Sequence, residues 1–181
     1  KISADYFYYP KKGFGTITKN LANNIREKGN KIHLESTLSK IEVKNNKVTA
    51  VEIEKLGERK IVNVDFLVSS IPLLNLVNIL SPKPPQKVLD EVKKLKYRSV
   101  ILFYIVTNKE KPLKDNWVFY PEKEFIFNRI SDHKSFSPHT CPPGKRVLTI
   151  EITCNEGDEI HQANDQVLFD KVIPSLKKLG I

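Results

Sequence analysis

Three prolines close together divide this sequence. The segment Ser81-Pro82-Lys83-Pro84-Pro85 fits neither a helix interior nor a central strand, because proline lacks the backbone N–H that both structures use. Helical patterns flank it on both sides. Residues 73–80 carry an apolar stripe, and residues 86–96 are amphipathic. The chain is therefore expected to fold as separate blocks of elements.

A further helix is expected near the start of the chain. In Gly13-Phe14-Gly15-Thr16 the two glycines permit a tight turn, and Thr16 is a preferred type of N-cap. Apolar residues then recur every four positions over 17–25, and Gly29-Asn30 predicts the end of the helix.

Short segments rich in β-branched and aromatic residues predict strands. Asn45-Asn46 predicts a hairpin turn between two of them, and 99–107 is expected to be a buried strand. A last helix is expected over 166–179. Because strands and helices come in blocks and not in a regular alternation, the predicted fold class is α+β. The expected strands are 31–35, 39–43, 47–53, 66–68, 99–107, 117–120, 125–130 and 146–153.

Composition and charge limit the classes of partner. Apolar residues make up 40% of the 181 residues, which permits a core, and no apolar run has the length of a membrane span. The net charge of +9 suggests anionic partners. The lysines are scattered and no RNA- or DNA-binding pattern occurs, so nucleic acid is not expected. Peripheral contact with a membrane stays open, as does the oligomeric state.

The two cysteines, Cys141 and Cys154, match no metal-binding spacing. Free thiols in a reducing compartment are the expectation, which favours a cytoplasmic location. The sequence begins at Lys1 and contains no methionine. We therefore expect a fragment of a longer protein.

Established catalytic motifs are missing from the sequence. It has no GxGxxG, no GxxxxGK[ST], no HExxH and no GxSxG, and its four histidines share no ligand spacing. No metal site and no catalytic residue is predicted.

Three local features remain as candidates, each with an ordinary alternative. The turn at Gly13 to Thr16 is either an anion site at a helix start or a simple connection. Arg129 either binds a phosphate or carboxylate, or forms a surface ion pair. The aromatic residues between 117 and 127 either line a pocket or form core.

The order of these features resembles the FAD-dependent flavin amine oxidase superfamily, which includes protoporphyrinogen oxidases, carotenoid desaturases and UDP-galactopyranose mutases. The resemblance begins with Tyr9-Pro10-Lys11-Lys12-Gly13-Phe14-Gly15, a helix, and Lys31-Ile32-His33-Leu34. It continues with Val64-Asp65-Phe66-Leu67-Val68-Ser69-Ser70-Ile71-Pro72, which is similar to a family strand ending in a small residue, any residue and proline.

The second half resembles the eukaryotic-type UDP-galactopyranose mutases. The matching segments are Asn116-Trp117-Val118-Phe119-Tyr120-Pro121-Glu122, Phe127-Asn128-Arg129 and Phe136-Ser137-Pro138. The interval of four residues from Trp117 to Pro121, and of eight from Pro121 to Arg129, is that of the mutases.

The resemblance implies roles for individual residues on the substrate side. Arg129 corresponds to an arginine that binds the substrate diphosphate. Phe119 corresponds to a tyrosine directed at the same group, and it lacks that hydroxyl. Phe127 belongs to the same implied substrate-binding element.

The resemblance also implies a cofactor, FAD. Leu38 corresponds to a residue whose main chain meets the FAD adenine. Ser70 and Pro72 are implied at a strand end of the cofactor domain, and Gly13, Phe14 and Gly15 near the flavin and substrate. Residues 1–72 would be part of the FAD-binding domain and 73–181 the substrate-binding domain. Because the GxGxxG region is missing, stoichiometric FAD is expected only in the full-length protein.

Three functions follow as hypotheses. The leading one is an FAD-dependent oxidoreductase of the amine oxidase and protoporphyrinogen oxidase type, with a small apolar or aromatic substrate over the second-half sheet. The second is a mutase-like flavoenzyme acting on a nucleotide-sugar. The third is a non-catalytic binding module that keeps the same fold.

Overall fold

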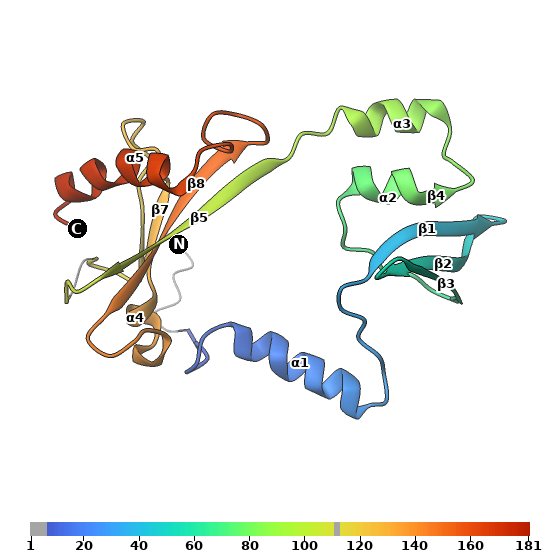
Figure 1. Ribbon diagram of the computed structural model, residues 1–181, viewed down its shortest axis with the longest axis horizontal. Helices are drawn as coiled ribbons and strands as arrows, with labels where there is room; N and C mark the ends of the chain where they lie inside the picture. The colour runs from blue at the N-terminus through green and yellow to red at the C-terminus, as the bar shows by residue number, and fades with distance from the viewer. Residues whose placement is uncertain (1–6, 111–112) are drawn as a thin grey trace. The chain divides into compact units, whose positions relative to one another are not determined.

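A computed structural model describes residues 7–110 and 113–181. The chain forms two compact units (Figure 1). Unit 1 comprises Lys1–Lys28 and Tyr97–Ile181, and unit 2 comprises Gly29–Lys96. These limits differ from the predicted ranges 1–72 and 73–181, which were assigned by cofactor and substrate role. That assignment of roles stays a prediction.

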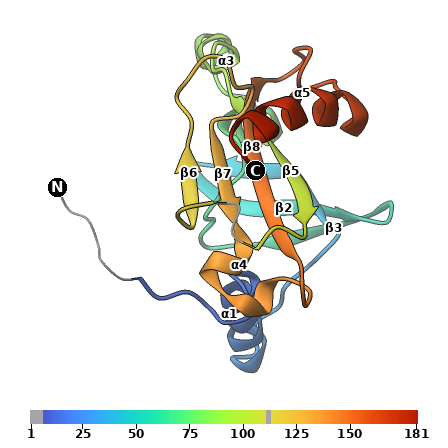
Figure 2. The ribbon, with the colours of Figure 1, turned by 90° about the vertical axis from the view of Figure 1, so that its left-hand side faces the viewer.

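Unit 1 is built on a four-stranded antiparallel sheet in the order β5-β8-β7-β6 (Figure 2). The elements of this unit are α1 (Gly15–Glu27), β5 (Arg98–Thr107), β6 (Trp117–Phe119), β7 (Arg129–Asp132), α4 (His133–Phe136), the 3-10 helix η1 (Pro138–Thr140), β8 (Arg146–Asn155) and α5 (Asp165–Lys178).

The core of unit 1 lies between this sheet and α5. Leu168, Val172 and Leu176 recur at helical spacing along α5 and are buried. They pack in one cluster with Ile130 of β7 and Ile150 of β8, both 0% exposed. Burial of these side chains is the main favourable contribution to the folding of unit 1. The helix therefore covers one face of the sheet.

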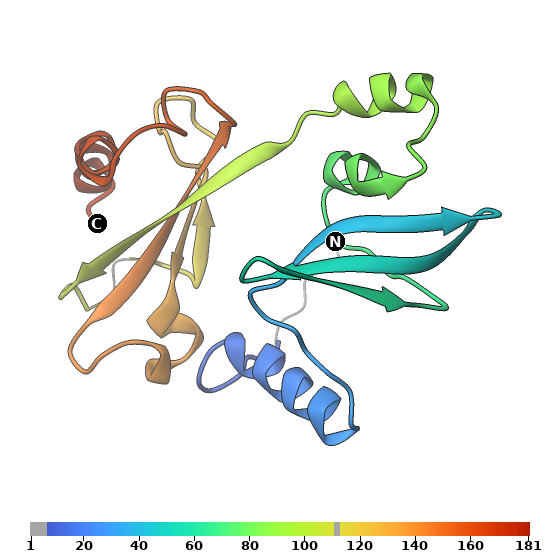
Figure 3. The same cartoon turned by 45° about the vertical axis from the view of Figure 1, so that its right-hand side comes forward.

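Unit 2 contains a second four-stranded sheet, in the order β3-β2-β1-β4 (Figure 3). The strands β1, β2 and β3 are antiparallel, and the short β4 runs parallel to β1. Val77 and Val92 of the two helices are buried, as are Ile41, Ala50 and Val51 of the sheet. The elements are β1 (Thr37–Lys44), β2 (Lys47–Lys55), β3 (Glu58–Asn63), α2 (Leu73–Ile79), β4 (Leu80–Ser81) and α3 (Gln86–Lys93).

The predicted α+β class is confirmed, and so are several local predictions. Asn45 and Asn46 have φ of 49° and 60° at the β1–β2 turn, which asparagine tolerates better than most residues. Gly29, with φ of 76°, follows the end of α1.

Cys141 and Cys154 are free thiols. Burial, helped by Asp158 and opposed by Arg98, raises the pKa of the Cys154 thiol.

Two predicted strands in unit 2 are wrong. Residues 31–35 are irregular, and Glu35 has a φ of 54°, which no regular strand accommodates. Residues 66–68 are also irregular, with Phe66 92% and Val68 97% exposed. Both segments carry strand-like sequences, but in the described residues neither has a neighbouring strand to pair with.

Three predictions in unit 1 need correction. Thr16 is not the N-cap, because α1 begins at Gly15 with Phe14 as its cap residue. The strand expected over 125–130 begins only at Arg129, so the connection from β6 to β7 is longer than predicted. The strand over 99–107 is confirmed as β5, but its exposure alternates along its length, so one of its faces is open.

Candidate functional site

The register of the unit 1 sheet places two rows of side chains on the face opposite to α5. We call these eight residues the open face. One row is Leu102, Glu151, Arg129 and Phe119, and the other is Tyr104, Thr149, Ser131 and Trp117. Because side chains alternate between the faces of a strand, the neighbouring row of Phe103, Ile150, Ile130 and Val118 points into the core.

Exposure distinguishes the large apolar residues of the open face from the centre of the core face. Tyr104 is 56% exposed, Leu102 49% and Phe119 60%, whereas Ile150 on the core face is 0% exposed. These half-exposed apolar side chains lie on the two edge strands β5 and β6, with polar residues of β8 and β7 between them. Exposed apolar side chains grouped on one face are typical of binding surfaces. The open face is therefore the strongest candidate for ligand contact in unit 1.

Arg129 lies near the centre of the open face and is held by Glu151. Its Nε and Nη2 donate to Oε1 of Glu151 at 2.8 and 2.5 Å. Its guanidinium carbon lies 5.5 Å from the centroid of the Phe119 ring, within the range of a cation–π contact. The Arg129 side chain is 37% exposed and that of Glu151 17%. The arginine is therefore fixed in place, and its charge is balanced by a carboxylate.

An aromatic cluster borders Arg129. Trp117 stacks on Phe136, with ring centroids 5.5 Å apart and an interplanar angle of 13°. Tyr9 lies 5.0 Å from Phe136 and 6.1 Å from Phe14, centroid to centroid. These four side chains line a cavity of about 360 Å³ together with Phe7, Tyr8, Arg129 and Ser131. The space thus has aromatic walls and one arginine.

The turn that carries Phe14 is attached to the sheet by α4 and η1. Ser137, 6% exposed, donates from Oγ to the backbone carbonyl of Lys11 at 2.6 Å. Gly13 has a φ of 89°, so a side chain there would be strained even though a Cβ would meet Thr140 at an ordinary 3.7 Å. The predicted glycine turn and the predicted Phe136-Ser137-Pro138 segment therefore meet in space.

A polar group on the open face was not predicted. His133 Nε2 lies 2.5 Å from Thr149 Oγ1, and its ring centroid lies 6.2 Å from that of Tyr104. The histidines carry no sequence signal for this role. The strand around Thr149 does carry one, since Thr149, Glu151 and Thr153 alternate with buried apolar residues and so indicate a polar face.

The predicted cofactor residues are divided between the units. Gly13, Phe14 and Gly15 lie in unit 1, and of these Phe14 lines the aromatic cavity. In this turn the N–H groups of Gly13, Thr16 and Ile17 donate to carbonyls of the turn itself. Most of the amides at this helix start are therefore occupied, which leaves little of an anion cradle.

The other three predicted cofactor residues lie in unit 2. Leu38 is in β1, opposite Ile53, at a register shift in the ladder. Ser70 is exposed, and Pro72 immediately precedes α2. Phe127, predicted to bind substrate, is 2% exposed and packs against Tyr120 and Phe125 in the core. It is therefore not part of the open face.

Residues 5–181 match the family described as flavin containing amine oxidoreductase. The chain belongs to this family. Membership implies a flavin cofactor, and the resemblance seen in the sequence is thereby confirmed. Comparison with curated proteins gave no significant match.

Solved structures show the same fold. A reduced UDP-galactopyranose mutase superposes with a TM-score of 0.72 at 18% identity, over 96% of this chain and 37% of that one. An oxidoreductase from Methanosarcina mazei gives 0.74 at 18%, over 94% and 39%. A candidate protoporphyrinogen oxidase from an Exiguobacterium species gives 0.69 at 16%, over 93% and 36%. The chain thus spans less than two fifths of each of these structures.

The aromatic cavity fits one part of a flavin cofactor and not the other. Its aromatic walls and glycine turn suit the flat ring system. A dinucleotide also needs a glycine-rich turn with free amides for its diphosphate, and no such turn occurs in the described residues.

Among the helices of 7–110 and 113–181, none combines the length and hydropathy needed to cross a membrane.

Proposed function

We propose that this chain is part of an FAD-dependent oxidoreductase of the amine oxidase and protoporphyrinogen oxidase type, and that its open face receives a flat apolar or aromatic substrate. The main support is that Glu151 already neutralises the charge of Arg129. The aromatic side chains of Tyr104, Trp117 and Phe119 on the same face are 39 to 60% exposed. A neutral aromatic surface favours an apolar ligand over a multiply charged one.

The bound flavin supplies hydride acceptance, which no side chain of the chain provides. The residues of the chain would orient the substrate and exclude water. Tyr104, Trp117 and Phe119 offer flat contact surfaces, and the fixed guanidinium of Arg129 can hold a single polar group of the ligand. The Gly13–Gly15 turn would stand at the flavin side and Leu38 would offer its main chain to the adenine.

The neutral flat aromatic dye 1-aminoanthracene tests the open face. We expect it to quench the fluorescence of Trp117, the single tryptophan, in a saturable titration. Replacing both Tyr104 and Phe119 with alanine removes two aromatic contacts and should weaken binding about tenfold. The measurement is the dissociation constant from the quenching curve, recorded for wild-type protein and variant under the same conditions.

The matched control for this titration is Phe169→Ala. Phe169 is a 43% exposed aromatic residue of the same unit, but it lies on α5, which covers the other face of the sheet. It should leave the dissociation constant unchanged. Equal losses in the control and in the double variant, or quenching that does not saturate, would show that the ligand does not use the open face.

A nucleotide-sugar substrate is the second candidate, because Arg129 lies on the open face and the chain shares its fold with a UDP-galactopyranose mutase. If Glu151 neutralises Arg129, UDP should bind weakly to the wild-type chain. Glu151→Gln should strengthen UDP binding about tenfold by releasing the guanidinium charge. Isothermal titration calorimetry measures both constants. Strong UDP binding by the wild-type chain, abolished by Arg129→Ala, would favour the mutase-like function instead.

A further inference from the structure

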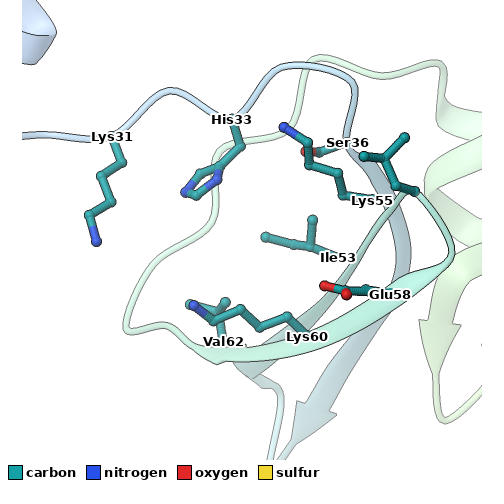
Figure 4. A pocket seen from close by; sticks show the side chains of 9 residues that line it. Lys31, His33, Ser36, Ile53, Lys55, Glu58, Lys60 and Val62 are labelled. Carbon is teal, nitrogen blue, oxygen red and sulfur yellow. The ribbon is translucent and has the colours of Figure 1, made fainter.

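A second cavity lies within unit 2, remote in sequence from the residues of the open face. It has a volume of about 510 Å³ and lies between the segment 31–36 and the β2–β3 hairpin. Figure 4 shows Lys31 and His33 extending from that segment toward the hairpin, and Lys60 extending back from β3. Lys55 lies beside Ser36, and Ile53 and Val62 form the floor.

The sheet register explains why the lysines gather here. Ile53 pairs with Lys60 and Lys55 with Glu58, so these side chains lie on one face of the hairpin. Arg59 lies on the other face, where Glu52 and Glu54 approach it at 3.8 and 3.2 Å.

The cations of the cavity lack such partners. Within 7–110 and 113–181, no ion pair or side-chain hydrogen bond involves Lys31, Lys55, Lys60 or His33. Three lysines against the single carboxylate of Glu58 leave a net charge of +2 before His33 is counted. The cavity is therefore an uncompensated positive site over an apolar floor.

The tip of the hairpin adds an independent observation. Leu56 has a φ of 50° and is 89% exposed, and it lines the cavity. At the corresponding β1–β2 turn the residues with positive φ are asparagines, which accept this conformation at lower cost. An exposed leucine in a left-handed conformation is disfavoured by both backbone and solvent. A ligand whose apolar part covers Leu56 would account for its presence.

We propose that this cavity binds the phosphate group of a ligand that also carries an apolar or flat body. The phosphate lies among Lys31, Lys55 and Lys60, and the body rests on Ile53, Val62 and Leu56. Soluble nucleotides and phospholipid head groups share this chemistry. The site is separate from the open face, and its lining does not include Leu38, which is proposed to meet the adenine of FAD.

Nuclear magnetic resonance of the ¹⁵N-labelled full chain tests the proposal, with ADP as the soluble probe. Saturable shifts are expected at the amides of 31–36 and 53–62. Lys55→Gln combined with Lys60→Gln should weaken ADP binding about tenfold. Leu56→Asn, which suits the turn better, should also weaken ADP binding while leaving inorganic pyrophosphate binding unchanged.

The matched control is Lys44→Gln combined with Lys47→Gln. These lysines flank the β1–β2 turn of the same sheet. Replacing them removes as much positive charge as replacing Lys55 and Lys60. They should leave the ADP affinity within about twofold, since bulk charge acts weakly at physiological salt. Preserved amide dispersion shows that each variant is folded.

Vesicles of phosphatidylcholine with and without phosphatidic acid distinguish the two sources of phosphate. Binding of ADP that is weakened in the Lys55 and Lys60 variant but kept in the control identifies a soluble ligand. Sedimentation only with phosphatidic acid vesicles, lost in the Lys55 and Lys60 variant but kept in the control, identifies a lipid head group. If neither probe binds, or if both double variants lose affinity equally, the cavity is no phosphate site and the proposal is overturned.

Discussion

Replacing Asp132 with alanine is expected to lower the free energy of unfolding of unit 1 by about 3–5 kcal/mol. Asp132 is 0% exposed and forms an ion pair with Arg146. It also accepts hydrogen bonds from Ser135 Oγ at 2.8 Å and from the backbone N–H of Lys134 at 3.0 Å. Alanine leaves the Arg146 guanidinium, whose side chain is only 16% exposed, without its counterion.

Urea denaturation followed by Trp117 fluorescence measures this loss, because the single tryptophan lies in unit 1 and reports on that unit alone. Glu124→Ala is the matched control. Glu124 also pairs with a cation, Lys178 at 2.6 Å, but both side chains are more than half exposed. Its removal should cost less than about 1 kcal/mol. Similar losses in the two variants would mean that the Asp132 pair is not buried in solution.

This buried pair matters for the open face because of where Asp132 stands. It ends β7 and caps α4, the short helix that carries His133 and Phe136. His133 covers Thr149, and Phe136 stacks on Trp117. A network of a buried charge and several hydrogen bonds can fix one orientation of such a helix. Asp132 therefore positions the aromatic cluster without touching a ligand itself.

Local sequence signals predicted those features whose causes are local. The β1–β2 turn was predicted from Asn45 and Asn46, which tolerate positive φ, and α1 because its apolar residues recur every four positions. The strand β3 was missed. Its sequence, Glu58 to Asn63, is mostly charged or polar, and it forms a strand because it pairs with β2 at the edge of the sheet.

The site depended on pairings that no local pattern contains. Arg129 was a candidate both as a local feature and through the family resemblance. Its partner Glu151 lies 22 residues away in sequence and meets it only through the β7–β8 register. The resemblance also pointed to Phe127, whose aromatic side chain the structure places in the core. The sequence alone does not show whether an aromatic side chain faces solvent or the core, so its exposure is known only from the fold.

The difference between exposed and core positions also predicts a large difference in stability between two variants. They truncate aliphatic residues on neighbouring strands of the unit 1 sheet. Ile150→Ala is expected to destabilise unit 1 by about 2–5 kcal/mol, since Ile150 is 0% exposed in the cluster beneath α5 and its truncation leaves a cavity. Leu102→Ala removes a similar amount of side chain from the adjacent strand β5, where Leu102 is 49% exposed. Its cost should stay below about 1 kcal/mol.

Both values come from the same urea titration, read by Trp117 fluorescence. The two side chains lie on opposite faces of one sheet. The difference between the two losses in free energy of unfolding therefore shows which face is covered by other side chains. A large loss for Ile150 with a small one for Leu102 means that α5 holds the core face closed while the open face stays accessible to a substrate. Comparable losses would mean that Leu102 is packed in solution. In that case the open face would serve as core, and the substrate would have to bind elsewhere.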